Sequence, residues 1–384
     1  MSRTHACSVC ECNCRNLALL NMRLYIIAGE ASGDLHGSNL VRALLRERRD
    51  VTLRAWGGDL MREAGADVVK HYRDLAFMGF VEVLLNIRTI LKNLSFCKKD
   101  ITDFRPDALI LIDYPGFNMR IAAWAKKQGI PVFYYISPQI WAWKENRVHA
   151  LKRDVQLMCV VLPFEKEFYA KHGMRAEFVG HPLLDVRREI PQESQREKII
   201  ALLPGSRKQE ISTMLPVMLA ACAHLEGYEI IVAGAPGQEN AFYESYLRGT
   251  NAKILFGQTQ ELLGKATAGL ITSGTATLEA GIMALPQVVC YKGNFISYMI
   301  ARKLIQVKFI SLVNLILDRE CVPEMIQGEM NAVQLRKQLD ALLTDTPERK
   351  TQVSGYRELR EKLGGSGASE RTAKAMLKSL ECSQ

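Results

Sequence analysis

The sequence lacks any uninterrupted apolar run of about 18 residues, the length that indicates a membrane-spanning helix. The two longest candidates, 77–91 and 295–305, are broken by the charged residues Glu82, Arg88, Arg302 and Lys303. The first 21 residues also lack the sustained apolar segment that a signal peptide requires. These absences argue against an integral membrane protein and against a secreted precursor.

The composition shows no bias toward disorder, because 48% of the 384 residues are hydrophobic and 24% are charged. A chain of this length is too long for one ordinary core and suits two domains. The formal net charge of +9 favours anionic partners such as a nucleotide, a nucleic acid or an acidic membrane surface. No nucleic-acid-binding module is recognisable, so we expect no nucleic-acid partner. A basic surface with no single purpose is an equal alternative.

The cysteines do not form the paired pattern of a structural zinc site. Four of the ten lie close together at Cys7, Cys10, Cys12 and Cys14, but no second pair follows at zinc-finger spacing. Others stand singly in apolar surroundings and are expected to be reduced core residues, namely Cys97, Cys159, Cys222, Cys290 and Cys321. We therefore expect no metal site. We interpret residues 1–21 as a disordered extension or a misassigned start.

From Met22 onward, short apolar runs alternate with segments of helical spacing such as 35–48 and 119–128. The first predicted strands are 23–29, 53–58, 108–113, 131–137, 157–163 and 177–181. After a polar stretch at 185–198, further strands are predicted at 199–206, 229–235, 253–257, 268–274 and 286–292. Apolar strands separated by helices indicate parallel sheets covered on both faces.

The fold class predicted from this alternation is α/β, with two Rossmann-like doubly wound domains in tandem. We expect an N-terminal domain at 22–190 and a C-terminal domain at 191–350. The remainder, 351–384, is predicted to form one or two exposed helices, which could pack back on the N-terminal domain.

The segment "AGEASGD" at 28–34 joins the first strand to the first helix. Gly29 and Gly33 let the backbone turn sharply, and Ser32 or Asp34 could cap the helix. The segment fits neither the Walker A pattern nor the G-x-G-x-x-G pattern of nucleotide-binding loops. Because the carboxylates of Glu30 and Asp34 would repel phosphate, it favours a subsite for sugar hydroxyls. A simple capped turn is the alternative.

Two segments of the second half are suited to a diphosphate. In "LLPGSR" at 202–207, Gly205 and Ser206 offer backbone donors and Arg207 can pair with a diphosphate through two hydrogen bonds. In "TSGTATLEAG" at 272–281, Gly274 and Thr275 open a helix whose positive end attracts an anion. Glu279 lies one turn further on, where ribose hydroxyls would be. A solvated helix glutamate is the alternative.

Taken in order, eight motifs resemble the lipid A disaccharide synthases, a family of bacterial inverting glycosyltransferases. They are "GEASGD", "MGFVEVL", "IDYPGFN", "YYISPQIWAWKENRV", "LPFEKEFY", "LLPGSR", "SGTATLE" and "SLVNLI". The resemblance covers about 22–317 and implies a GT-B architecture with the active site in the interdomain cleft. It also implies that 2,3-diacylglucosamine is transferred from its UDP derivative to 2,3-diacylglucosamine 1-phosphate (lipid X). The products would be a β-1,6-linked disaccharide 1-phosphate and UDP.

The resemblance also implies roles for single residues. Asp113, at the end of a buried strand, would take the proton of the acceptor hydroxyl, and Asn118 would hydrogen-bond this carboxylate or the sugar. Glu30 is the rival base. The alternative for Asp113 is a purely structural role at the entry to the following helix. Asn314 would lie near the nucleotide. No metal or other cofactor is implied, and no Asp-x-Asp pair stands at a predicted strand end.

The stretch 77–99 is apolar on more than one helical face and ends in two lysines. Given acylated substrates, it favours a surface for acyl chains and anionic lipid, with a soluble core helix as the alternative. The proposed contacts are Phe77, Met78, Phe80 and Leu84. We therefore expect peripheral attachment to the inner face of the cytoplasmic membrane of a Gram-negative bacterium.

Two other functions share these features. One is a UDP-N-acetylglucosamine 2-epimerase or a related GT-B enzyme, and the other is a nucleotide-sugar-binding protein without catalysis. The acyl-chain length and the formation of a homo-oligomer are left open by the sequence.

Overall fold

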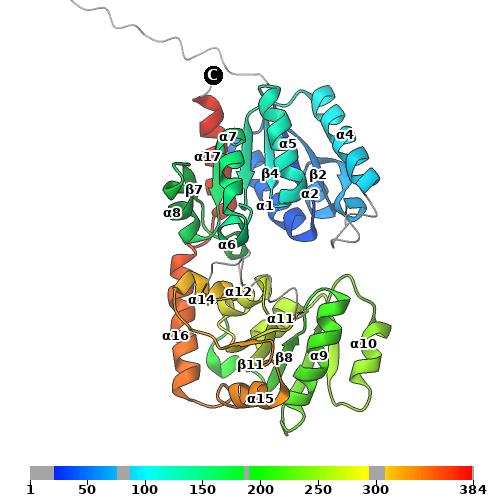
Figure 1. The fold of residues 1–384 in the computed structure, drawn as a ribbon, viewed down its shortest axis with the longest axis vertical. Coiled ribbons are helices and arrows are strands. Elements are labelled where there is room, and N and C mark those ends of the chain that lie inside the picture. Colours follow the sequence, from blue (N-terminus) through cyan, green and yellow to red (C-terminus); the bar gives the residue numbers. More distant parts are fainter. Residues whose placement is uncertain (1–20, 76–86, 186–189, 294–307, 383–384) are drawn as a thin grey trace, which may run out of the picture. The chain divides into compact units, whose positions relative to one another are not determined.

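The computed structural model describes residues 21–75, 87–185, 190–293 and 308–382 (Figure 1). Two sheets dominate the described chain, one built from strands before residue 179 and the other from strands after residue 198.

The first sheet has seven strands in the order β3-β2-β1-β4-β5-β6-β7. They are β1 (Met22–Ala28), β2 (Val51–Gly57), β3 (Asp67–His71), β4 (Ala108–Ile112), β5 (Val132–Tyr135), β6 (Leu157–Val160) and β7 (Ala176–Phe178). The helices between them are α1 (Ala31–Glu47), α2 (Asp59–Glu63), α4 (Ile87–Phe104), α5 (Pro115–Lys127), α6 (Ile140–Trp143), α7 (Val148–Asp154) and α8 (Pro163–Lys171). Strand β1 pairs in parallel with both β2 and β4, and β4 is buried along its whole length.

The second sheet has six parallel strands in the order β10-β9-β8-β11-β12-β13. They are β8 (Ile199–Leu203), β9 (Glu229–Gly234), β10 (Lys253–Phe256), β11 (Ala268–Thr272), β12 (Gln287–Tyr291) and β13 (Glu324–Ile326). The helices that follow β8 in the chain are α9 (Lys208–Cys222), α10 (Asn240–Leu247), α11 (Thr259–Lys265), α12 (Thr275–Ile282), α14 (Leu312–Leu317), α15 (Ala332–Asp340), α16 (Pro347–Lys362) and α17 (Ala368–Glu381).

Alternate residues of β8 belong to two separate core clusters. Ile200 and Leu202 pack in one cluster, whereas Ile199, Ala201 and Leu203 pack in the other. Successive side chains of a strand point to opposite faces, so this division means that both faces of the sheet are covered. Coverage of both faces explains why the strand is apolar throughout rather than alternating with polar residues.

Both sheets repeat one topology. In each sheet, the strand that comes first in the chain lies in the interior, and later strands are added first on one side of it and then on the other. The strand order therefore reverses between β1 and β4 in the first sheet and between β8 and β11 in the second. Ligands of doubly wound sheets bind outside the carboxyl ends of the strands at such a reversal. The topology thus predicts one site after β1 and β4 and another after β8 and β11.

The chain divides into two compact units that do not follow the sheets completely. One contains the described residues of Met1–Tyr134 with Asp154–Gln156 and Ala373–Gln384, and the other contains Tyr135–Arg153 and Leu157–Thr372. Helix α17 begins in the second unit, where the Asp185 carboxylate accepts hydrogen bonds from the backbone N–H groups of Gly367, Ala368 and Ser369.

The structure confirms the predicted tandem α/β fold but corrects several details. Strands β3 and β13 were not predicted. The C-terminal helices are not merely exposed, because α16 buries Tyr356 and Leu359 completely and α17 buries Ala373. The single cysteines expected in the core are buried and free, as predicted. The Cys-rich cluster near the start lies outside the described residues.

Candidate active site

Asp113 and Glu30 follow neighbouring strands at the first topological reversal. Ala28 of β1 pairs with Ile112 of β4, so the two carboxylates leave adjacent strand ends. Asp113 and Tyr114 both have left-handed backbones, with φ of 44° and 47°. Each such non-glycine residue costs about 1–3 kcal/mol, and strain of this kind persists only where surrounding contacts enforce it.

Two buried side chains enforce the turn at Asp113. The Asn118 amide nitrogen donates to the carbonyl oxygens of Asp113 at 2.8 Å and of Ile112 at 3.2 Å. The Tyr134 hydroxyl donates to the same Asp113 carbonyl at 2.5 Å. Asn118 is fully buried, and its amide nitrogen holds the backbone of the turn. A contact of its side chain with the carboxylate or the sugar stays a prediction.

The surroundings of Asp113 keep its carboxyl close to the titration range of a general base. Burial, and next the negative charge of Glu30, raise the pKa of Asp113 to about 6. Gly29 lies under the ring of Tyr114, and a Cβ at this position would overlap that ring. Ser32 is exposed in the first turn of α1, and the Glu30 side chain does not cap that helix.

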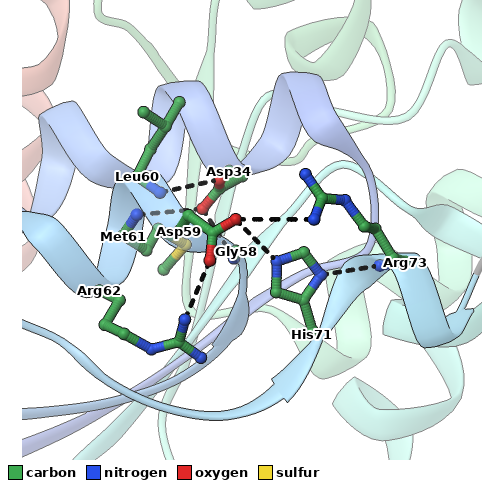
Figure 2. Close-up of polar contacts among 8 residues, drawn as sticks. All are labelled: Asp34, Gly58, Asp59, Leu60, Met61, Arg62, His71 and Arg73. Carbon is green, nitrogen blue, oxygen red and sulfur yellow. Dashed lines mark hydrogen bonds and ion pairs between the residues drawn. The ribbon is translucent and has the colours of Figure 1, made fainter. Parts of the chain in front are cut away.

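Asp34 has a structural role that differs from the expected sugar subsite (Figure 2). Its buried carboxylate accepts backbone hydrogen bonds from Gly58 at 2.7 Å and Met61 at 3.1 Å, at the start of α2. Its oxygens thus bind the neighbouring turn rather than a ligand. Figure 2 also shows Asp59, whose carboxylate contacts Arg62 and two other basic side chains, His71 and Arg73.

A cavity of about 570 Å³ lies at the second topological reversal. It is lined by the turns that follow β8, β9 and β11 and by the first residues of α9 and α12. The predicted residues that line it are Ser206, Arg207, Gly274, Thr275 and Glu279. The structure therefore brings together both segments that the sequence suggested for a diphosphate.

Backbone conformation explains the glycine in the turn after β8. Gly205 has φ of +118°, and an added Cβ would lie 2.8 Å from a Glu210 carboxylate oxygen. Any other residue would be strained and would displace Glu210. Gly274, with φ of +151°, has open space where a Cβ would stand, which leaves the start of α12 accessible.

Glu210 modifies the expected donor set and was missed by the sequence analysis. It accepts hydrogen bonds from the backbone N–H groups of Ser206 at 3.2 Å and Arg207 at 3.3 Å. It also pairs with the Arg207 guanidinium at 3.3 Å. The Ser206 N–H is therefore occupied, although the Arg207 side chain remains 65% exposed. A glutamate at the third position of a helix is a capping signal that could have identified it.

Glu279 lines the cavity from α12 and accepts a hydrogen bond from the Gln260 amide nitrogen on α11. Gln260 was not predicted, because it is distant in sequence and α11 carries no recognisable motif. Its contact orients the Glu279 carboxylate toward one side. A glutamate that was only solvated would have no such partner, so these contacts favour a binding role for Glu279.

Asn314 is fully buried and does not line the cavity. Its amide nitrogen donates to Val322 O at 2.8 Å, and its amide oxygen accepts from Cys321 N at 2.7 Å. These bonds join α14 to the segment before β13. The asparagine therefore stabilises the fold here, and its expected place near the nucleotide stays a prediction.

The predicted acyl-contact residues lie outside the described residues, namely Phe77, Met78, Phe80 and Leu84. The described helix α4 follows them in the chain. Within the described parts of the chain, no helix combines the length and apolar character needed to cross a bilayer.

Tandem doubly wound sheets of this topology define the GT-B fold, and solved structures of that class match it. The structure of a UDP-GlcNAc 2-epimerase from Methanocaldococcus jannaschii matches with a TM-score of 0.64 and 14% sequence identity. The match covers 93% of this chain and 100% of the epimerase chain. The kitacinnamycin glycotransferase covers 93% of this chain over 98% of its own, with a TM-score of 0.63 and 14% identity. At such identities the likeness shows the fold alone.

Sequence comparison identifies the family within that class. A family model described as Lipid-A-disaccharide synthetase matches residues 24–378, and the chain belongs to this family of glycosyltransferases. The lipid-A-disaccharide synthase of Anaeromyxobacter dehalogenans is 39% identical over 93% of this chain and 97% of its own length. That of Syntrophus aciditrophicus is 40% identical over 91% of this chain and 95% of its own length.

Proposed function

We propose that this glycosyltransferase condenses UDP-2,3-diacylglucosamine with 2,3-diacylglucosamine 1-phosphate. The products are the β-1,6-linked lipid A disaccharide 1-phosphate and UDP. The observation that carries the proposal is the family match along nearly the whole chain, residues 24–378. The sites after β4 and β8 supply groups suited to the two halves of this reaction.

We assign residues 191–350 to the UDP-sugar. The cavity after β8 and β11 combines the exposed Arg207 side chain with the open N-terminus of α12. Both carry positive potential, which stabilises a bound diphosphate and the UDP that leaves. Glu279 accepts hydrogen bonds from hydroxyls, so it suits the ribose.

We assign residues 22–190 to the acceptor and Asp113 to the general base. An inverting transfer needs a base that removes the acceptor hydroxyl proton as the oxygen attacks the anomeric carbon. A carboxyl with a pKa of about 6 is ionised at neutral pH and is more basic than an ordinary aspartate. Glu30 is the alternative base because its carboxylate is close enough to raise the pKa of Asp113.

We further propose peripheral attachment to an anionic membrane through the region of α4. Two apolar side chains of this helix are notably exposed, Leu91 by 54% and Phe96 by 46%. Exposed basic residues accompany them, namely Arg88, Lys92 and Lys99. At about 3.6 residues per turn, the three basic residues fall between the two apolar ones on this helix. A basic strip with an apolar side chain at each edge suits the boundary between acyl chains and anionic head groups.

Epimerisation of a UDP-sugar is the competing function, since epimerases share the fold. No feature of the described site favours it, and the family match favours transfer. The deciding experiment incubates the purified protein with both acylated sugars. We expect a disaccharide 1-phosphate by mass spectrometry, with a β anomeric coupling by NMR. Epimerised donor, or UDP without any disaccharide, would refute the proposal.

A further inference from the structure

An exposed aromatic ring with two cations stands in the loop that follows β5. Trp143, the last residue of α6, is 54% exposed. The Lys144 ammonium lies 3.9 Å from the centroid of its ring, and the Arg147 guanidinium carbon lies 5.9 Å from it. We call these three residues the Trp143 platform.

The cations of the Trp143 platform are not neutralised by any acidic side chain in the described parts of the chain. Among those residues, neither Lys144 nor Arg147 forms an ion pair, because the intervening Glu145 binds His172 at 2.9 Å instead. Partial burial, and next the charge of Arg147, lower the pKa of Lys144. Because two positive side chains lie beside one ring and neither pairs with a carboxylate of the described residues, the platform is suited to bind a doubly charged anion.

The platform rests on a rigid base. The fully buried Glu165 carboxylate accepts hydrogen bonds from the Ser137 hydroxyl at 2.5 Å and the Trp141 indole at 3.2 Å. The loop begins at Ile136, whose φ of +60° is strained for a β-branched residue. This anchoring holds the segment leading to Trp143 in one conformation, which reduces the entropy lost when a ligand binds.

We propose that the Trp143 platform binds a phosphate monoester carried on a sugar. Lys144 and Arg147 pair with the phosphate, which carries a charge near −2 at neutral pH, and the Trp143 ring covers an apolar face of the sugar. This inference rests on the proposed function, in which the acceptor carries a phosphate monoester at C1, whereas the C1 phosphate of the donor is part of the UDP diphosphate.

The test compares two acceptors in detergent micelles, 2,3-diacylglucosamine with and without its 1-phosphate. For Lys144→Gln and Arg147→Gln, we expect KM for the phosphorylated acceptor to rise about 10- to 100-fold, because each variant loses one charged hydrogen bond to the phosphate. Its kcat should change little, and the kinetics of the unphosphorylated acceptor should be unaltered. Lys144→Arg should restore KM. Arg175→Gln, at an exposed arginine paired with Glu177, is the matched control.

Equal effects on both acceptors, or none on either, would overturn the inference. So would a loss of binding to anionic vesicles with unaltered micelle kinetics, because the cations would then contact lipid head groups. Retained UDP affinity shows that each variant is folded. If the wild type transfers to neither acceptor, the proposed function fails. Titration with glucosamine 1-phosphate, expected to bind wild type at least tenfold tighter than Arg147→Gln, then decides the inference separately.

Discussion

At the scale of the residue, Asp113 combines backbone strain with an elevated pKa. The fold holds it in a left-handed conformation through Asn118 and Tyr134, although an ordinary helix entry needs no such strain. Burial and Glu30 then make its carboxyl a stronger base. A residue kept in this state against considerable strain is better explained by chemistry than by helix capping.

The raised pKa of Asp113 predicts a specific pH dependence. Because only the ionised carboxylate can accept a proton, kcat/KM should fall about tenfold per pH unit below about 6 and level off above it. Glu30→Gln removes the second cause of the shift, so the midpoint should move to lower pH. A profile without a break between pH 5 and 7 in the wild type would contradict the role of Asp113.

Some residues could be assigned from sequence and others could not. Asp113 was recognisable because it ends a continuous apolar run, where parallel strands present their ligands. The backbone partners of Asn118 and Asn314 were not predicted, since a short amide after a turn looks the same whether it faces a ligand or a backbone carbonyl. Gln260 and Tyr134 act through partners distant in sequence, and no local pattern reveals such contacts.

At the scale of the element, the turn between β8 and α9 sets the geometry of the nucleotide cavity. Gly205 permits the turn, and Glu210 ties its N–H groups to the first turn of the helix. The turn therefore depends on a side chain of the helix that it introduces.

Gly205→Ala should weaken UDP binding about tenfold or more and lower the free energy of unfolding by about 1–3 kcal/mol, because the new Cβ is strained and displaces Glu210. Isothermal titration with UDP and thermal unfolding measure both effects. Gly237→Ala is the control, since a Cβ added there would meet no atom within 4 Å and the φ of Gly237 is not positive. Equal UDP affinity in the two variants would disprove this account of the turn.

The sequence predicted all the interior strands of the two described sheets and two of their four edge strands, β7 and β10. β1, β4, β8 and β11 are buried apolar runs and were recognised. β3 and β13 are short strands at the sheet edges, partly exposed and partly polar, so their pattern resembles that of loops. For β3 and β13, the main evidence of a strand is the neighbour with which each pairs, and that neighbour is not visible in the local sequence.

At the scale of the whole molecule, the surface of α4 predicts reversible membrane attachment. Each inserted apolar side chain contributes about 1–2 kcal/mol and each basic residue about 1 kcal/mol near an acidic surface. Replacing Leu91 and Phe96 together by serine should reduce sedimentation with anionic vesicles at low salt while leaving UDP affinity unchanged. Val333→Ser, at an apolar residue exposed on α15, is the matched control. Unaltered vesicle binding would exclude this surface.

The central claim is a division of labour between the two sheets, with the base after β4 and the nucleotide after β8 and β11. Asp113→Asn tests it most directly, because the carboxamide keeps the shape of the side chain but cannot accept the proton. We predict that kcat falls by about 100-fold or more while the Kd for UDP stays within about twofold of wild type. Retention of most of the activity, or loss of UDP binding together with turnover, would contradict the claim.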